Sequence, residues 1–224
     1  MKKIAVIVAG GNGARMGSAV PKQFLKLKGK PVLYYTINAF LESYPDLDII
    51  LVLPEEHIAS GQEIIDAYFD HNRIKITAGG RTRFHSVQQG LALIEEECIV
   101  LVHDAVRCLV TPDLIRNCSE AVLEFGSAVP VIAVSDSIRK ISEEGSEIVD
   151  RAGLRAVQTP QAFYSKMIIP AFNIDFKERF TDEATVLEAF GMTVHLVEGS
   201  EENLKITKPV DLLIAEKFLD ERGA

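Results

Sequence analysis

The sequence predicts an α/β fold with a Rossmann-like, mostly parallel sheet flanked by helices. Apolar runs rich in β-branched residues recur along the 224 residues, and such runs are typical of strands buried on both faces. Helical patterns separate most of these runs, which favours parallel strands joined by helical crossovers. No proline-rich, serine-rich or long charged stretch marks a linker, so we expect one domain spanning residues 1–224.

Six apolar runs are expected to form strands. The first, residues 4–9 (IAVIVA), leads directly into a group of glycines. The carboxyl ends of parallel strands lie at one edge of the sheet, where α/β proteins bind their ligands. The other expected strands are Ile49–Leu53, Ile74–Ala78, Cys98–His103, Ala128–Val134 and Thr193–Val197.

Apolar residues at helical spacing predict helices around residues 33–41, 84–94 and 115–125. Thr111-Pro112 supplies an N-cap and an N1 proline for the third of these helices. Thr207-Lys208-Pro209 is a similar entry to a last helix at Val210–Leu219.

Residues 135–163 interrupt the alternation of strands and helices. Two short β-like pieces, Ser137–Ile141 and Glu147–Asp150, flank a Glu-Glu-Gly-Ser turn signal. This segment has little core pattern of its own. We therefore expect a hairpin arm that leaves the sheet.

The composition, with 47% hydrophobic and 25% charged residues, is ordinary for a globular protein. The net charge of −8 opposes general binding to nucleic acid or to an anionic membrane. No apolar run approaches the roughly 20 residues of a membrane span, so a cytoplasmic protein is expected. Three cysteines lack CxxC spacing and five histidines lack HExxH spacing, so we expect reduced thiols and no transition-metal site built by the protein.

A glycine-rich segment follows the first strand and predicts a phosphate-binding loop. Glycines 10, 11 and 13 allow backbone N–H groups to approach an anion without a Cβ in the way, and Arg15 adds a cation. The next glycine, Gly17, comes one residue too late for the dinucleotide fingerprint GxGxxG. A Walker A loop would need Gly-Lys followed by Ser or Thr, which the segment lacks.

Lys22 is predicted to bring a second cation to the same loop, because Pro21 fixes the chain just before it. Nucleotidyl transfer places extra charge on the non-bridging oxygens of the attacked phosphate. Arg15 and Lys22 could stabilise this charge without a covalent nucleophile, which makes them the catalytic candidates. The alternative for Lys22 is an ordinary solvated lysine on a surface loop.

These residues, with six further segments, resemble the methylerythritol phosphate cytidylyltransferase family of isoprenoid precursor synthesis. The glycine loop with Arg15-Met16 and Pro21-Lys22-Gln23 resembles the signature of small nucleotidyltransferases in general. The narrower resemblance rests on pieces spread over most of the chain. They are Gly79-Gly80-x-x-Arg83-x-x-Ser86-Val87, His103-Asp104-Ala105-Val106-Arg107, Asp150-Arg151, Gln158-Thr159-Pro160-Gln161, Thr181-Asp182-Glu183-Ala184 and Glu198-Gly199-x-x-x-Asn203-x-Lys205-Ile206-Thr207.

The resemblance implies CTP as nucleotide, methylerythritol phosphate as acceptor, Mg²⁺ bound with the CTP phosphates, and a homodimer joined through the arm. The implied nucleotide-binding residues are Ala9, Gly10, Gly11, Gly13, Gly80, Arg81, Ser86, Asp104 and Ala105. The implied acceptor-binding residues are Arg107, Ser137, Arg151, Thr159, Thr181 and Lys205, of which Arg151 reaches the site of the partner subunit.

Some of these residues have a plainer interpretation. Gly80, Arg81 and Ser86 follow an expected strand and could read a base or hold phosphate through backbone donors, or could simply cap a helix. Asp104 ends a strand and could meet ribose, metal or phosphate. It could equally pair with Arg107 only to fix the loop.

Alternatives remain for the function as well. Val106 is also typical of ribitol phosphate cytidylyltransferases, so ribitol phosphate is a second candidate acceptor. A nucleotide-dependent oxidoreductase and a non-catalytic nucleotide-binding module are rivals of other classes. In the favoured mechanism the acceptor phosphate attacks the α-phosphorus of CTP and pyrophosphate leaves. No general base is needed, because the attacking phosphate, with a second pKa of about 6, is already largely ionised.

Overall fold

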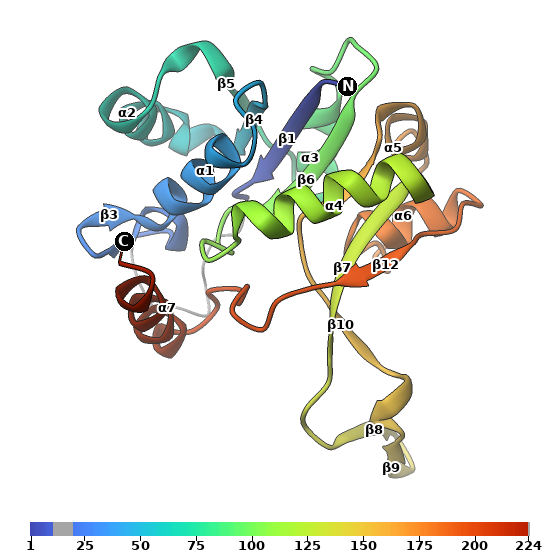
Figure 1. The fold of residues 1–224 in the computed structure, drawn as a ribbon. Coiled ribbons are helices and arrows are strands. Elements are labelled where there is room, and N and C mark those ends of the chain that lie inside the picture. Colours follow the sequence, from blue (N-terminus) through green and yellow to red (C-terminus); the bar gives the residue numbers. More distant parts are fainter. Residues whose placement is uncertain (11–19, 224) are drawn as a thin grey trace.

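A computed structural model describes residues 1–10 and 20–223 of the chain. Its centre is an eight-stranded sheet in the order β10-β7-β11-β6-β1-β4-β5, with β12 paired to β7 (Figure 1). The strands of this sheet are β1 Lys3–Val8, β4 Asp48–Leu53, β5 Ile74–Ala78, β6 Ile99–Asp104, β7 Ser127–Ala133, β10 Arg155–Val157, β11 Gln161–Tyr164 and β12 Leu196–Glu198.

The sheet is mostly parallel, as predicted. Strands β6, β1, β4 and β5 are parallel neighbours, and β12 is parallel to β7. Two short strands run the other way. β11 lies antiparallel between β6 and β7, and β10 pairs antiparallel with the outer part of β7. Neither strand was expected from the sequence. The arm was predicted to extend to residue 163, but β11 already belongs to the main sheet from Gln161 onward.

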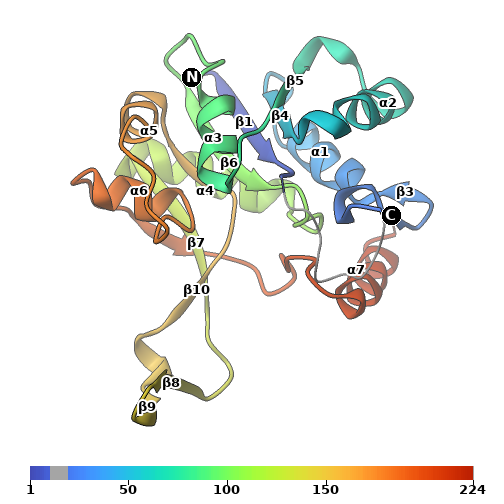
Figure 2. The ribbon, with the colours of Figure 1, turned by 180° about the vertical axis from the view of Figure 1, so that it is seen from behind.

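Helices cover both faces of the sheet because side chains of each buried strand alternate between them. Ala5 and Ile7 belong to one core cluster with residues of α1, α2 and α4, whereas Val6 and Val8 belong to another with residues of α3, α5 and α6. Figure 1 shows α1 and α4 in front of the sheet. Figure 2, the view from the other side, shows α3, α5 and α6 covering the opposite face. The helices are α1 Val32–Ser43, α2 Ile58–Tyr68, α3 Arg83–Leu91, α4 Pro112–Phe125, α5 Ser165–Ala171, α6 Glu183–Ala189 and α7 Pro209–Glu221.

The predicted start of α4 is confirmed. The Thr111 hydroxyl accepts a hydrogen bond from the Leu114 backbone N–H at 3.2 Å, and Pro112 occupies the first turn. The helix ends at Gly126, whose φ of 82° lies in the left-handed region that glycine adopts without strain. Helix α7 begins at Pro209, and its residues Ala215 and Leu219 pack on Leu109 and Ile206.

The predicted arm is present as a hairpin outside the main sheet, formed by β8 (Ile138–Ser142) and β9 (Gly145–Val149). Figure 1 shows it projecting well beyond the layers. Its Ile141 and Ile148 are 75% and 78% exposed. A 3₁₀ turn at Arg151–Gly153 leads the chain back to β10. The arm is shorter than the expected range because Gln161–Tyr164 is a largely buried strand of the main sheet.

Smaller elements complete the described chain. Strands β2 (Lys26–Leu27) and β3 (Lys30–Pro31) form a short hairpin, and 3₁₀ turns occur at Lys22–Phe24, Glu55–His57 and His71–Arg73. Cys98, Cys108 and Cys118 are buried free thiols, as expected. Within the described ranges, no helix combines the length and the apolar character needed to cross a bilayer. The cytoplasmic location stays a prediction.

Candidate active site

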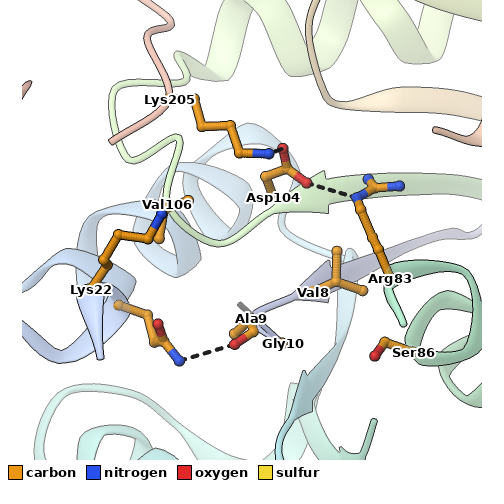
Figure 3. A pocket seen from close by; sticks show the side chains of 10 residues that line it. Val8, Ala9, Gly10, Lys22, Arg83, Ser86, Asp104, Val106 and Lys205 are labelled. Atoms are coloured by element: carbon orange, nitrogen blue, oxygen red, sulfur yellow. Dashed lines mark hydrogen bonds and ion pairs between the residues drawn. The ribbon is translucent and has the colours of Figure 1, made fainter. Parts of the chain in front are cut away.

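A pocket lies at the carboxyl ends of β1 and β6, the edge of the sheet where the sequence predicts ligand (Figure 3). The predicted residues Gly11, Gly13 and Arg15 lie outside the described part of the chain. The described residues that line the pocket are Val8, Ala9, Gly10, Lys22, Gln23, Arg83, Ser86, Asp104, Val106 and Lys205. Ala105, another predicted nucleotide-binding residue, is fully buried behind this lining, and its backbone N–H donates to the Val8 carbonyl at 3.0 Å.

Lys22 is a buried lysine of this pocket and not a solvated surface residue. It begins the 3₁₀ turn after Pro21, and its side chain is 7% exposed. The ammonium Nζ donates to the backbone carbonyl of Ile206 at 3.1 Å. The next residue, Gln23, donates from Nε2 to the Ala9 carbonyl at 2.9 Å and so ties this turn to the end of β1. The segment therefore places a cation beside the start of the glycine loop.

A second hollow continues the pocket beside Ser86. Its described lining is Gly10, Pro54, Glu55, Glu56, Gly79, Gly80, Arg81 and Ser86. The Ser86 hydroxyl lies 3.2 Å from the Gly80 backbone N and 3.1 Å from the Thr82 carbonyl oxygen, which holds the turn after β5. A Cβ added at Gly80 would lie 2.4 Å from Cβ of His85, so this turn requires glycine. The N-cap of α3 is Thr82, which leaves Gly80 and Arg81 facing the hollow.

Asp104 is the centre of a cluster of charges. Its Oδ1 lies 3.0 Å from Nε of Arg83, and its Oδ2 lies 2.8 Å from Nζ of Lys205 and 3.7 Å from Nε of Arg107. Burial alone would raise the pKa of Asp104, but the Arg83 and Lys205 cations hold it well below its usual range. The Asp104 carboxylate therefore stays ionised and fixes the cations on either side of it (Figure 3).

A third pocket adjoins the first and shares Arg83, Asp104 and Lys205 with it. Four residues predicted to bind the acceptor meet in this adjoining pocket. Its lining is Arg83, Asp104, Arg107, Val157, Gln158, Thr159, Gln161, Thr181, Asp182 and Lys205. Arg107 also anchors the loop after β6, because its Nη1 donates to the Asn203 carbonyl at 2.8 Å.

The Thr159 hydroxyl has partners inside the protein. Nε2 of the fully buried His103 lies 3.2 Å from the Arg107 carbonyl oxygen, and Nδ1 lies 3.0 Å from the Thr159 hydroxyl. A carbonyl only accepts, so Nε2 carries the hydrogen and Nδ1 accepts from Thr159. The Thr159 hydroxyl also accepts from the Asp104 backbone N–H at 3.1 Å. Thr159 therefore helps to position Asp104, and its contact with the acceptor phosphate stays a prediction.

The buried His103 should make the folded state less stable in acid. Burial lowers the pKa of His103 from 6.5 to about 3, so between these values the unfolded chain binds a proton that the folded chain excludes. The contribution of His103 to the free energy of unfolding should fall by up to about 1.4 kcal/mol per pH unit as the pH drops through this window. Urea unfolding of a His103→Gln variant should therefore depend less on pH than that of the wild type.

The matched control is His71→Gln, which replaces an exposed histidine and should leave the pH dependence nearly unchanged. A His103→Gln variant that lost stability in acid as steeply as the wild type would show that His103 is not the titrating group.

Ser137 and Arg151 are not brought to the pockets of their own chain. Both are exposed on the arm, and neither lines the three pockets described above. The Arg151 guanidinium donates to the Ser135 carbonyl at the base of the hairpin. The assignment of Ser137 and Arg151 to the acceptor therefore stays a prediction.

Comparison with known proteins identifies the family. The profile of the 2-C-methyl-D-erythritol 4-phosphate cytidylyltransferase family matches residues 3–221. The chain belongs to this family. The cytidylyltransferase of Bacteroides thetaiotaomicron is 44% identical over 219 residues, which cover 98% of this chain and 100% of the relative. That of Clostridium perfringens (strain SM101) is 40% identical over 222 residues, covering 97% and 99%.

Solved structures of the family share the fold. The 4-diphosphocytidyl-2C-methyl-D-erythritol synthase of Anaerococcus prevotii superposes with a TM-score of 0.83 at 26% identity, covering 97% of this chain and 96% of that one. The cytidylyltransferase of Thermus thermophilus superposes with a TM-score of 0.76 at 30% identity, covering 97% and 99%. The chain is thus a CTP-dependent cytidylyltransferase that acts on methylerythritol phosphate.

The structure shows that several residues not assigned to the site from the sequence lie in or beside it. Arg83 and Glu183 stood in the quoted motifs but were not assigned to the site, although they form an ion pair beside Asp104. Gln158 accepts from the Ser200 backbone N–H at 3.1 Å and donates to the Ser200 carbonyl at 2.8 Å. These two hydrogen bonds hold the segment that leads to Lys205. The only sequence signal for these residues was their place next to predicted ones.

The charges of the site bear on where a divalent cation could bind. Asp104 is the one acidic residue among the described lining of the first pocket, and Arg83 and Lys205 already pair with it. The described residues contain no group of three or more His, Cys, Asp or Glu side chains that could hold a metal. A carboxylate oxygen beside bound phosphates suits Mg²⁺, which commonly takes one or two carboxylates and otherwise water and phosphate oxygens.

Proposed function

We propose that the two adjoining pockets bind CTP and 2-C-methyl-D-erythritol 4-phosphate side by side, and that the acceptor phosphate attacks the α-phosphorus of CTP in line. The observation that carries this proposal is the shared wall of the pockets, Arg83, Asp104 and Lys205. Two phosphorylated ligands that meet at one cationic wall can be aligned without forming a covalent bond to the protein.

The nucleotide occupies the first pocket and the hollow beside it. Gly10 and the glycine loop that follows receive the triphosphate, and the turn at Gly80 and Arg81 receives the base. Lys22 lies beside the start of the loop and, together with Arg15, stabilises the charge that builds up on the α-phosphate oxygens. Pyrophosphate leaves opposite the attacking oxygen.

A Mg²⁺ ion bound with the triphosphate would be held mainly by phosphate oxygens and water, and Asp104 is the one described residue of the first pocket whose carboxylate could hold it. It would supply positive charge that offsets the charge of the phosphates. Asp104 would also keep Lys205 in place, because its Oδ2 contacts that ammonium.

The arm supports a homodimer in which each subunit completes the site of the other. The register pairs Arg139 with Ile148 and Ile141 with Ser146, so both isoleucines lie on one face of the hairpin. Two large aliphatic side chains exposed together on a projecting hairpin favour contact with another protein surface. A second copy of the chain would supply that surface and would bring the partner's Arg151, with Ser137 nearby, to the acceptor phosphate.

The reaction is tested by measuring pyrophosphate release from CTP with methylerythritol phosphate, with ribitol phosphate and without an acceptor. We expect rapid release only with methylerythritol phosphate. Release with ribitol phosphate alone would contradict the proposed acceptor, and no release with either would contradict the proposed function.

Substitutions of Thr181 and Lys205 should differ in their effect on CTP binding. Thr181 lines only the acceptor pocket, so Thr181→Val should raise the acceptor KM by roughly 10- to 100-fold, the value of a hydrogen bond to a charged group, and leave CTP affinity unchanged. Lys205 lines both pockets, so Lys205→Ala should weaken both ligands. Calorimetric titration with CTP and steady-state kinetics with the acceptor give the two quantities.

The control is Thr193→Val, which removes an exposed hydroxyl between α6 and β12 and should change neither quantity. A large loss of CTP affinity in Thr181→Val would remove Thr181 from the acceptor site.

A further inference from the structure

A buried chain of ion pairs connects α6 to the wall shared by the two pockets. The Arg83 guanidinium lies between two carboxylates. Its Nη1 and Nη2 contact Oε1 and Oε2 of Glu183 at 2.5 and 3.2 Å, and its Nε contacts Oδ1 of Asp104 at 3.0 Å. The other oxygen of Asp104 contacts Lys205 at 2.8 Å. The order is thus Glu183, Arg83, Asp104, Lys205.

Glu183 is more deeply buried than the other residues of this series of ion pairs. Its side chain is completely buried, whereas those of Arg83 and Lys205 are 27% and 39% exposed. The start of α6 is clamped to β11, because Gln161 donates to Asp182 at 2.9 Å and accepts from the Ala184 backbone N–H at 2.9 Å. Glu183 is therefore a fixed point at the back of the site.

Glu183 lines neither pocket, but it determines which charges remain for the ligands. Its two oxygens satisfy both terminal nitrogens of Arg83 with the planar, two-bond geometry that guanidinium groups favour. Without this carboxylate, the terminal nitrogens of Arg83 would be free to turn toward a phosphate or to compete with Lys205 for Asp104. Each movement would displace the cations that align the two substrates.

We propose that Glu183 is a positioning residue, which holds Arg83 against Asp104 and thereby fixes Lys205 where the two pockets meet. The proposal rests on the function given above, because it assigns Lys205 to the junction of the CTP and acceptor sites. Glu183 acts through Arg83 and touches neither substrate.

The test compares Glu183→Gln, which keeps shape but removes the charge, with Glu188→Gln on the exposed side of the same helix. In Glu183→Gln we expect kcat to fall at least tenfold, because the substrates are misaligned. The acceptor KM should not rise, because a negative charge near two anionic ligands has been removed. Glu183→Asp, which restores the charge, should recover part of the lost kcat.

The value of kcat is calculated from the concentration of CTP-binding sites measured by calorimetry, so that unfolded protein does not lower it. A Glu183→Gln enzyme with wild-type kcat per site would overturn the positioning role. An enzyme whose acceptor KM rose with unchanged kcat would overturn it too, since Glu183 would then only support the binding surface. A wild-type enzyme that releases no pyrophosphate from CTP and methylerythritol phosphate would overturn the proposed function instead.

A double substitution tests the route through Arg83 even if Glu183→Gln folds poorly, because it removes both charges of the buried pair together. The kcat of Arg83→Gln/Glu183→Gln should lie within about twofold of that of Arg83→Gln alone. A further loss of tenfold or more in the double variant would show that Glu183 acts independently of Arg83 and would contradict the proposal.

Discussion

Replacing Lys22 with alanine is expected to lower kcat by roughly 30- to 1000-fold, equivalent to about 2 to 4 kcal/mol of transition-state stabilisation. Lys22 is buried in the same pocket lining as Gly10, where an ammonium group interacts with phosphate oxygens more strongly than it would in water. Charge on the α-phosphate grows in the transition state, so kcat should suffer more than CTP affinity. The same result is expected for Arg15→Ala.

Steady-state kinetics and calorimetric titration with CTP measure the two effects. The control is Lys26→Ala, which removes an exposed lysine four residues along the chain and should leave kcat near the wild-type value. Because Lys22 also donates to Ile206, thermal unfolding should be compared as well. Near-wild-type turnover in Lys22→Ala would show that Lys22 is not catalytic. An equal loss of CTP affinity and kcat/KM would assign it to ground-state binding.

Mixed dimers should recover activity from two inactive variants. Lys22→Ala and Arg151→Ala are each expected to be inactive as homodimers, and refolding them together allows the subunits to exchange. If Arg151 acts in the partner's site, one site of each heterodimer combines intact Lys22 with an intact Arg151 from the other subunit. The other site carries both lesions, so about half of the wild-type activity per heterodimer is expected.

The physical basis is the position of Arg151, which lies outside the pockets of its own chain and follows a projecting hairpin with two exposed isoleucines. The control mixes Lys22→Ala with the double variant Lys22→Ala/Arg151→Ala, in which no site has an intact Lys22 and no activity can return. Heterodimers confirmed by mass spectrometry that remain inactive would rule out the exchanged arm.

Much of the fold was predictable because strands buried on both faces have a distinctive composition. The runs at β1, β4 and β6 are mostly aliphatic and almost completely buried, and no other local structure suits them as well. Strand β11 was missed because Gln161–Tyr164 is short and begins with glutamine. It is a strand only because β6 and β7 pair with both of its edges, which is information that lies far along the chain.

The candidate site was predictable where the chemistry is local. The glycines and Lys22 lie within one short segment, and their spacing indicated a phosphate site. The Arg83–Glu183 pair joins residues 100 positions apart, so no local pattern could reveal it. In isolation, Glu183 resembles an ordinary solvated acid in the first turn of a helix, where acidic residues are common. The hydrogen bond between Thr159 and the buried His103 joins residues 56 positions apart and could not be foreseen either.

The most direct test of the account is to follow the oxygens of the acceptor phosphate. Methylerythritol phosphate is prepared with oxygen-18 in all of its non-bridging phosphate oxygens and is incubated with unlabelled CTP. Attack by this phosphate on the α-phosphorus of CTP leaves every labelled oxygen in the CDP-linked methylerythritol and none in pyrophosphate. Mass spectrometry and ³¹P NMR show where the label lies. Loss of a labelled oxygen to water or to pyrophosphate would mean that the acceptor phosphorus was itself attacked, and would contradict the account.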